Sequence, residues 1–160
     1  MTMFNTNKII KSENILSTIE SIQKKNKKIV FTNGCFDILH VGHITCLNQA
    51  KSHSDLLWVG LNSDSSVKKL KGKTRPINDE QSRAFLLANL TCVDFVTIFN
   101  QDTPVELIKI IKPDIYVKGG DYKLEDLIEY PVVTSYGGSV IIESFVAGFS
   151  TTELLKKGNT

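Results

Sequence analysis

Short β-prone apolar runs alternate along the chain with segments whose apolar residues have helical spacing. The apolar runs lie at residues 29–31, 55–61, 93–99, 114–118 and 140–142. Runs that are apolar throughout are typical of strands buried on both faces, and the intervening helices supply the crossovers that parallel strands need. We therefore predict an α/β fold in a single domain, with a doubly wound, Rossmann-like, five-stranded parallel sheet and right-handed crossovers.

The N-terminal part of the chain is predicted to precede this sheet. Residues 1–11 are polar and are expected to be loosely held, whereas Ser12 can cap a helix that continues to about Lys25. The apolar stripe of that helix is Ile15, Leu16, Ile19 and Ile22. We expect residues 1–26 to form a tail and helix, and residues 27–160 to form the main domain.

Capping residues and apolar spacing predict the later helices. They cover residues 44–51, Asp79 to about Leu90, about 103–112, about 127 or 131 to 136, and a last helix that starts at Ser150. The polar residues 62–66 can also cap a short helical turn at residues 67–70. In the second of these helices, Phe85, Leu86 and Ala88 are expected to face the core. The cationic run at residues 68–76 contains a glycine and a proline, and is predicted to be a flexible loop.

Two histidines lie between the first predicted strand and the helix that follows it. Asn33-Gly34 is expected to break the strand, and a short loop then leads to the sequence HVGH at residues 40–43. The unpaired N–H groups and the dipole at the start of a helix attract anions. In an open α/β sheet, ligands also bind beyond the carboxyl ends of the strands. We therefore take this stretch as the candidate functional centre.

Composition and charge exclude several classes of protein. The chain has 160 residues, 41% of them hydrophobic, and its formal net charge of +2 is far from the basic bias of a nucleic-acid binder. Cys35, Cys46 and Cys92 form no CxxC pair, which suits a reducing cytoplasm. The sequence shows no signal peptide, and no apolar run approaches the ~20 residues of a membrane span. We expect a cytoplasmic protein with neither a nucleic-acid nor a membrane partner.

The histidine pair has two ordinary interpretations besides anion binding. Its i, i+3 spacing can serve zinc, but no third ligand occurs at motif spacing, so we predict no metal-binding residues. Alternatively, one histidine caps a turn and the other belongs to the core. The position after a strand and before a helix favours an anion site over both.

Residues 32–43, TNGCFDILHVGH, resemble the first signature of the HxGH nucleotidyltransferases. That superfamily includes the cytidylyltransferases, the pantetheine-phosphate adenylyltransferases and the class I aminoacyl-tRNA synthetases. Four further motifs, at residues 60–64, 71–78, 117–122 and 148–152, are similar to those of the adenylyltransferase modules of ADP-heptose synthesis. The resemblance runs from about Lys27 to Leu155.

The resemblance implies an HxGH nucleotidyltransferase fold and a specific reaction. AMP moves from ATP to D-glycero-β-D-manno-heptose 1-phosphate, giving ADP-heptose and pyrophosphate for lipopolysaccharide core biosynthesis. It also implies Mg²⁺ bound with ATP as cofactor, a sugar 1-phosphate as the second substrate, and a homodimer.

The resemblance also implies roles for individual residues. The catalytic residues would be His40, His43, Lys71 and Arg75. The nucleotide-binding residues would be Thr32, Asn33, Gly34, Phe36, Gly42, Lys118, Gly119, Asp121, Ser150, Thr151 and Thr152. The residues that bind the sugar phosphate would be Asp37, Asn62, Asp64 and Arg83.

Several of these residues have simpler interpretations that the sequence leaves open. Clustered lysines on a loop are usually solvated, and this applies to Lys68, Lys69 and Lys73 around the candidate Lys71. Arg83 can either bind the sugar phosphate or pair with a nearby acid, and Asp37 can be a turn cap. The glycines after Lys118 can mark a plain turn, and residues 150–152 an ordinary capping box.

Two other functions remain as alternatives. The same scaffold can carry a cytidylyltransferase that acts on glycerol 3-phosphate or a similar acceptor, or an enzyme like FAD synthetase. A protein of another class would bind nucleotide or RNA without catalysis through the cations at residues 68–75, but few aromatic residues interleave with those lysines.

Overall fold

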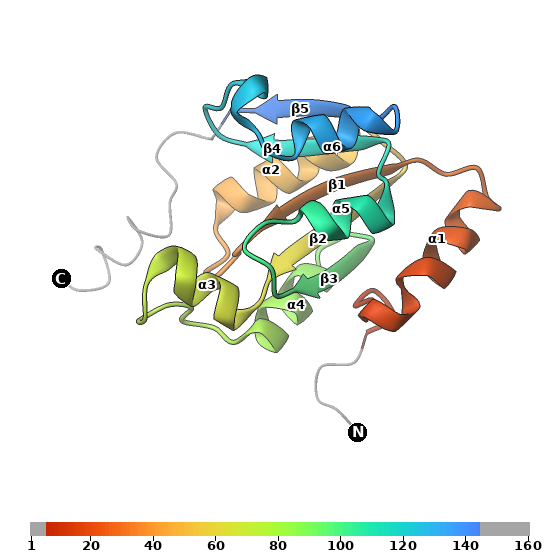
Figure 1. Ribbon diagram of the computed structural model, residues 1–160. Coiled ribbons are helices and arrows are strands. Elements are labelled where there is room, and N and C mark those ends of the chain that lie inside the picture. The colour runs from red at the N-terminus through yellow and green to blue at the C-terminus, as the bar shows by residue number, and fades with distance from the viewer. Residues whose placement is uncertain (1–5, 145–160) are drawn as a thin grey trace.

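A five-stranded parallel sheet forms the centre of the computed structural model, which describes residues 6–144 (Figure 1). The strands are β1 (Ile29–Gly34), β2 (Leu56–Asn62), β3 (Phe95–Phe99), β4 (Ile115–Gly119) and β5 (Ser139–Glu143). Their order across the sheet is β3-β2-β1-β4-β5, and every pair is parallel. The α/β class and the doubly wound parallel sheet are confirmed.

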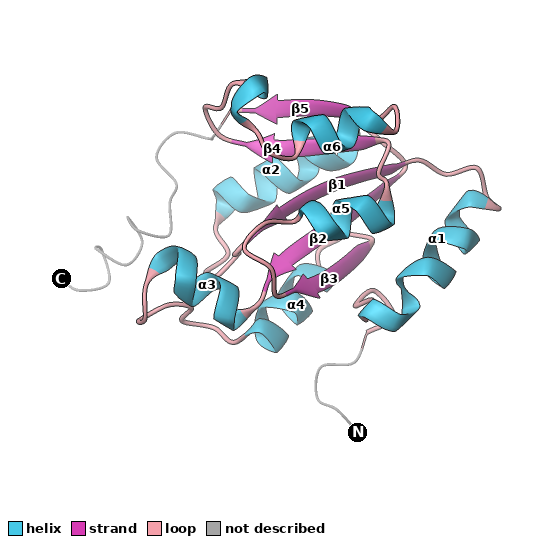
Figure 2. Ribbon diagram, in the orientation of Figure 1, coloured by secondary structure: helices cyan, strands magenta, loops and turns pink. Residues whose placement is uncertain are grey.

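Helices cover both faces of this sheet (Figure 2). They are η1 (Ser12–Asn14), α1 (Ile15–Gln23), α2 (Val41–Ser52), α3 (Asp64–Lys71), α4 (Glu80–Ala88), α5 (Val105–Ile111), η2 (Leu124–Asp126) and α6 (Tyr130–Ser135). One core cluster joins α1, α5 and α6 to one face, and a second joins α2 and α4 to the other. The strands therefore need apolar residues on both sides, which explains their continuous apolar runs.

The strand order reverses beside β1. The chain runs from β1 outward through β2 to β3, and then returns to place β4 and β5 on the opposite side of β1. At such a switch point the crossovers leave toward opposite faces of the sheet, which opens a crevice at the carboxyl ends of β1 and β4. The candidate signature therefore begins at the position where this topology accommodates a ligand.

The N-terminal segment is held more firmly than its polar sequence predicts. Ile9 bridges Val96 in parallel register, and Ile10 N donates to Val96 O at 2.8 Å. Lys8 Nζ donates to two backbone carbonyls at the end of α4 and the approach to β3. The expectation that residues 1–11 are loose is therefore wrong for residues 8–10, because they bond to Val96 at the outer edge of β3.

The buried apolar stripe of α1 is narrower than predicted. Ile15, Ile19 and Ile22 are buried, but Leu16 is 64% exposed because it lies about a quarter of a turn from that line. Ser12 does not cap α1, since it lies inside η1, and the N-cap residue of α1 is Asn14, which makes no side-chain capping bond.

Three other local predictions need correction. Asn33 and Gly34 do not break β1, because they pair with Gly60 and Leu61 of β2. The helical turn predicted at residues 67–70 is part of the longer α3, which ends at Lys71, so the loop is confined to residues 72–79. In α4 the residues that face the core include Ala84 and Leu87, whereas Leu86 is exposed and Phe85 half-buried. The predicted helix at Ser150 lies outside the described residues.

Candidate active site

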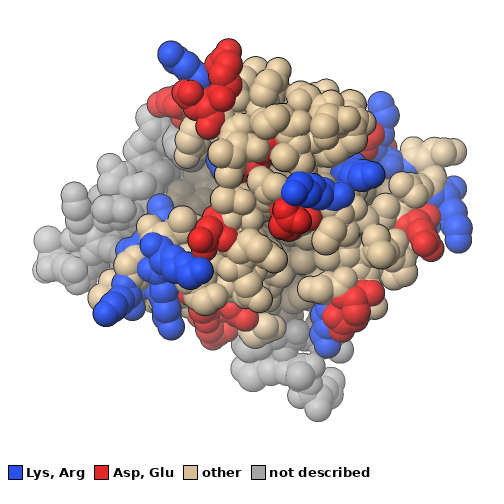
Figure 3. Space-filling view, viewed as in Figure 1, with Lys and Arg blue, Asp and Glu red and all other residues tan. Residues whose placement is uncertain are grey.

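The site is assembled at the carboxyl edge of the sheet, where β1, β2 and β4 end. Residues 35–40 connect β1 to α2, and Ser63 connects β2 to α3, so both connections begin at this edge. Figure 1 shows α3 beside the strand ends, and Figure 3 shows Lys and Arg side chains gathered over α3 next to a hollow in the surface. Most of the predicted site residues of the described chain therefore converge here, although they come from separate segments.

The two signature histidines lie face to face at the amino end of α2. Their rings stack with centroids 3.7 Å apart and an interplanar angle of 24°. His40 has an extended backbone and is the N-cap residue, because its Nδ1 accepts a hydrogen bond from His43 N at 3.4 Å. The capping interpretation is thus correct for His40, and it keeps the ring at the helix end where anions are stabilised.

Local packing fixes the loop before the histidines. The Phe36 ring lies 5.2 Å from the His43 ring, and Phe36 adopts a positive φ of 43°. A Cβ on Gly34 would come within 2.9 Å of the Phe36 ring, so glycine is needed there. Gly42 is buried in the first turn of α2. These small residues let the aromatic ring pack beside the imidazoles.

Electrostatics keep the imidazole pair neutral in the absence of a ligand. Burial, reinforced by His40, lowers the pKa of His43 to about 4, and the Ile38 carbonyl opposes this shift only partly. Burial also lowers the pKa of His40. His43 Nδ1 is buried and has no hydrogen-bond partner among the described residues. A bound phosphate beside the rings would favour their protonated form, because its negative charge stabilises an imidazolium.

Asp37 joins the signature loop to the loop after α3. Its carboxylate accepts from Arg75 Nε at 2.5 Å, from Ile77 N at 2.8 Å and from Asn78 N at 3.0 Å. Its carbonyl oxygen accepts from the Asn78 side chain. The Asp37 side chain is almost fully buried, so its carboxylate acts as an internal tie that fixes residues 75–78 against the signature.

Arg83 is a second tie, and it lies completely inside the protein. Its guanidinium donates to the carbonyls of Asn78, Cys35 and Asn62, and to the carboxylate of Asp64. Of the two alternatives for Arg83, pairing with an acid is the one the structure shows. Each bond reaches a different segment of the site, so one side chain holds the ends of β1 and β2 together with the start of α4.

The remaining cations are more exposed. Lys71 ends α3, and its charge acts against the burial that raises the pKa of the Cys35 thiol. Because burial is the larger effect, the pKa of Cys35 lies above its usual value, which favours the thiol over the thiolate. Lys68 and Lys73 are exposed, and Lys69 forms an exposed pair with Asp102.

Asn62, at the end of β2, is buried, and its side-chain amide donates to Ser66 Oγ at 2.9 Å.

The β4 side of the edge contains polar residues that the sequence analysis missed. Tyr116 is buried, and its hydroxyl donates to Asn33 Oδ1 at 2.8 Å. Lys118 Nζ donates to the buried Glu129 at 3.2 Å. Tyr116 looked like a core aromatic, and Glu129 lies where the secondary structure was ambiguous. The one sequence feature that could have indicated Tyr116 is its position two residues before Lys118, which places both side chains on the same face of the strand.

The predicted residues differ in how closely the fold gathers them. Thr32 is buried in β1, Gly119 ends β4, and Asp121 is exposed in the following turn. Ser150, Thr151 and Thr152 lie outside the described residues. No group of three or more His, Cys, Asp or Glu side chains in residues 6–144 is arranged to hold a metal ion.

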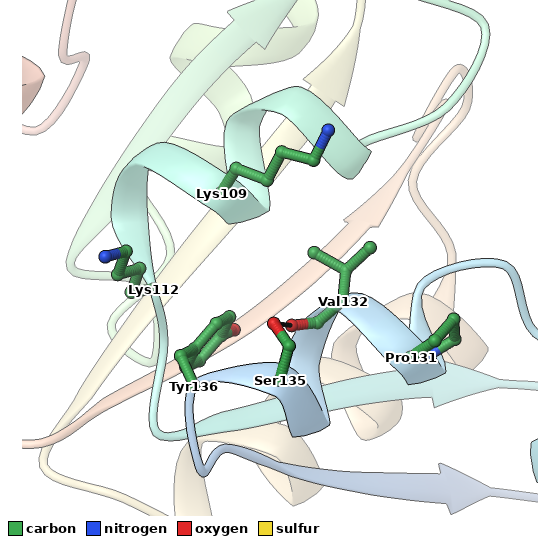
Figure 4. A pocket seen from close by; sticks show the side chains of 6 residues that line it. All are labelled: Lys109, Lys112, Pro131, Val132, Ser135 and Tyr136. Carbon is green, nitrogen blue, oxygen red and sulfur yellow. Dashed lines mark hydrogen bonds between the residues drawn. The ribbon is translucent and has the colours of Figure 1, made fainter.

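A separate groove lies between α5 and α6 (Figure 4). It has a volume of about 520 Å³ and is lined by Lys109, Lys112, Pro131, Val132, Ser135 and Tyr136. Ser135 donates to its own helix at Val132 O, and Lys109 pairs with Glu106. The groove reaches the carboxyl ends of both helices, which lie at the amino edge of the sheet, and it shares no residue with the signature.

The assembled edge can bind a polyphosphate. Two imidazoles lie at the amino end of α2 and cations lie on α3, while Asp37 and Arg83 hold the segments in place. Phosphoryl and nucleotidyl transfer depend mainly on such positioning and charge stabilisation, rather than on covalent steps by the protein.

The fold and this edge define a nucleotide-binding α/β domain with an HxGH signature. The chain belongs to the cytidylyltransferase-like family of nucleotidyltransferases, which matches residues 31–154. This match covers both sides of the crevice, from Phe31 in β1 to beyond β5.

Curated relatives resemble this chain over most of its length. The chain is 52% identical over 150 residues to the bifunctional protein HldE of Geobacter metallireducens, covering 94% of this chain and 31% of that protein. It is 50% identical over 149 residues to HldE of Helicobacter hepaticus, covering 93% and 30%. The chain thus spans about a third of the length of these curated relatives.

Solved structures show the same architecture. The lipopolysaccharide core biosynthesis protein of Thermoplasma volcanium is 32% identical with a TM-score of 0.60, covering 75% of this chain and 97% of that one. Pantoate-beta-alanine ligase of Francisella tularensis is 19% identical with a TM-score of 0.58, covering 94% and 77%, and so shares the fold alone. Among the described helices, none has the length and apolarity to cross a membrane.

Proposed function

We propose that this chain transfers AMP from ATP to D-glycero-β-D-manno-heptose 1-phosphate, releasing pyrophosphate and forming ADP-heptose. The observation that carries the proposal is the stacked His40–His43 pair at the start of α2, beside the carboxyl ends of β1 and β4. The sugar substrate is supported by the similarity to HldE proteins over more than nine-tenths of the chain, and by the likeness to a lipopolysaccharide core biosynthesis protein. The ADP-heptose product would serve lipopolysaccharide core biosynthesis.

His40 and His43 have the central role in this proposal. Their ring N–H groups donate to the phosphate oxygens of ATP and stabilise the charge that develops on the α-phosphate. The sugar phosphate oxygen attacks in line, and no general base is needed because that oxygen is already ionised. Lys71 and Arg75 approach the phosphates from the α3 side, and Arg75 is held ready by Asp37.

ATP enters as its magnesium complex. Asp37 and Asp64 are bound to Arg75 and Arg83, so the carboxylates nearest the signature are already neutralised by protein partners. Mg²⁺ held mainly by phosphates and water fits such a site, because this ion keeps several waters and few protein ligands. Thr32, Asn33, Gly34, Phe36, Gly42, Lys118, Gly119, Asp121 and residues 150–152 are proposed to surround the nucleotide.

A pyrophosphate-release panel tests the proposal. The purified chain is assayed with ATP and with CTP, each against heptose 1-phosphate, glycerol 3-phosphate and FMN. We expect pyrophosphate only with ATP and heptose 1-phosphate. Preferential turnover of CTP with glycerol 3-phosphate would favour the cytidylyltransferase alternative, and turnover of ATP with FMN the alternative like FAD synthetase.

The non-catalytic alternative gives a different result in the same panel. A binding module would release no pyrophosphate with any acceptor, and its RNA affinity would fall steeply with salt. Few aromatic residues interleave with the cations at residues 68–75, which argues against such a module.

The cytoplasmic location and the homodimer are part of the proposal. Cys35, Cys46 and Cys92 are free thiols, as expected in a reducing compartment. Sedimentation equilibrium of the purified chain tests the dimer, and a mass of one chain across the concentration range would reject it.

A further inference from the structure

Four polar side chains form a connected set beneath the β4 side of the crevice. The Tyr116 hydroxyl donates to Asn33 Oδ1 at 2.8 Å, and Lys118 Nζ donates to Glu129 Oε1 at 3.2 Å. The Lys118 ammonium also lies 6.0 Å from the Tyr116 ring centroid, so the two hydrogen-bonded pairs are neighbours. The set therefore runs from Asn33 in β1 through Tyr116 to Lys118 in β4, and from Lys118 to Glu129.

The two buried members have fixed positions. Tyr116 is fully buried, and its ring stacks on Phe31 with centroids 6.1 Å apart. Glu129 is 3% exposed, and a carboxylate so deeply buried must keep its partners, because losing one leaves an uncompensated charge. The hydroxyl and the carboxylate therefore act as rigid anchors for the two outer side chains.

The outer members, Asn33 and Lys118, are half-buried and border the crevice. With its oxygen engaged by Tyr116, the Asn33 amide keeps its N–H donors for another partner. The Lys118 ammonium lies 5.6 Å from the Tyr122 ring centroid and 3.2 Å from Glu129 Oε1. Neither outer side chain can rotate without breaking a contact to a buried partner.

We propose that Tyr116 and Glu129 are positioning residues for the nucleotide: they hold Asn33 and Lys118 in the orientation that ATP requires before it binds. This inference rests on the proposed function, in which Asn33 and Lys118 contact the nucleotide. Preorganised contacts cost less ordering entropy on binding. Because these groups act on bound and reacting ATP alike, their loss weakens affinity and leaves the chemical step unchanged.

The main test is Tyr116→Phe, which removes only the hydroxyl. We expect the Kd of ATP, measured calorimetrically on the full chain, to rise roughly three- to tenfold, the value for one neutral hydrogen bond. The KM for ATP rises in parallel, whereas kcat and the KM for the sugar phosphate stay within about twofold. Tyr136→Phe is the matched control, because the Tyr136 hydroxyl has no partner among the described residues and lies away from the signature.

Glu129→Gln is the second variant. It removes the charge that holds Lys118, and we expect the Kd of ATP to rise roughly tenfold. The control is Glu106→Gln, since the Glu106–Lys109 pair is exposed and lies on α5. If Glu129→Gln does not fold, Tyr116→Phe decides the question alone.

Two results would overturn the inference. One is a Tyr116→Phe chain that binds ATP as tightly as the wild type. The other is a chain whose melting temperature and kcat fall while its ATP affinity is unchanged, which marks a purely structural role. ATP titration does not depend on the acceptor, so a chain that binds ATP but does not use heptose 1-phosphate rejects the proposed function and still tests this inference.

Discussion

At the scale of single residues, the site depends on a few side chains whose environment determines their chemistry. His40 caps α2 through a ring nitrogen, while His43 is held neutral by burial beside it. Two neutral rings at a helix amino end can still donate to phosphate, and a bound anion raises their pKa. The histidine chemistry therefore depends on the ligand as well as on the fold.

Replacing His43 by alanine is expected to lower kcat by a factor on the order of 10² or more, because a hydrogen-bond donor to the transition state is lost. Initial rates of pyrophosphate release measure this. The control is His53→Ala, since His53 lies at the other end of α2, bound to Glu143. A His43→Ala chain with undiminished turnover would refute the role of that residue.

His43 also predicts how stability depends on pH. Its folded pKa of about 4 lies below the ~6.5 of an unfolded histidine, so between these values the unfolded chain binds more protons. The free energy of unfolding therefore falls as the pH decreases from about 6.5 to about 4. As the pH falls from about 6.5 to about 4, we expect the melting temperature of the His43→Asn variant to fall less than that of the wild type. Equal slopes for the two chains would contradict the assignment.

At the scale of elements, buried polar ties hold the separate segments of the site. Asp37 fixes residues 75–78, and Arg83 of α4 reaches the ends of β1 and β2. These segments are far apart in sequence, and apolar packing alone would leave their loops free to move. The cationic loop after α3 is consequently fixed at one end by Asp37, although its sequence suggested flexibility.

Arg83→Met should destabilise the chain by about 3 kcal/mol or more, because it leaves Asp64 and three carbonyls without their donor in a buried region. Urea unfolding measures the change. Lys69→Met removes an exposed ion pair on α3 and serves as the matched control, with an expected effect within about 0.5 kcal/mol. Similar losses for both variants would mean that the buried bonds contribute little.

At the scale of the whole molecule, the strand order places the site. Both sides of the crevice derive from strands that end at the same edge, and the two core clusters hold that edge rigid from opposite faces. The N-terminal segment contributes to one of these clusters through Ile10, Ile15, Ile19 and Ile22. The boundary predicted at residues 26 and 27 therefore separates two parts that share a hydrophobic core.

Removing residues 1–26 is expected to lower the melting temperature strongly, because it exposes the face of α5 that contacts α1 and removes the hydrogen bonds to Val96. Differential scanning calorimetry of the truncated and full chains measures this effect. Ile19→Ala gives a milder version, with an expected loss of about 2–5 kcal/mol, and the exposed Leu16→Ala is its control. A truncated chain as stable as the full one would contradict the shared core.

The sequence by itself determined the α/β class, the strands, most helix starts and the HxGH signature. These features follow from local patterns, namely apolar periodicity, capping residues and glycine at tight turns. Only the tertiary structure decided that Asp37 and Arg83 are internal ties, that residues 8–10 bond to the edge of β3, and that Tyr116 and Glu129 bind Asn33 and Lys118. The reason is physical: a side chain's role as tie or ligand is set by its burial and its partners, and these partners come from distant segments that no local pattern places together.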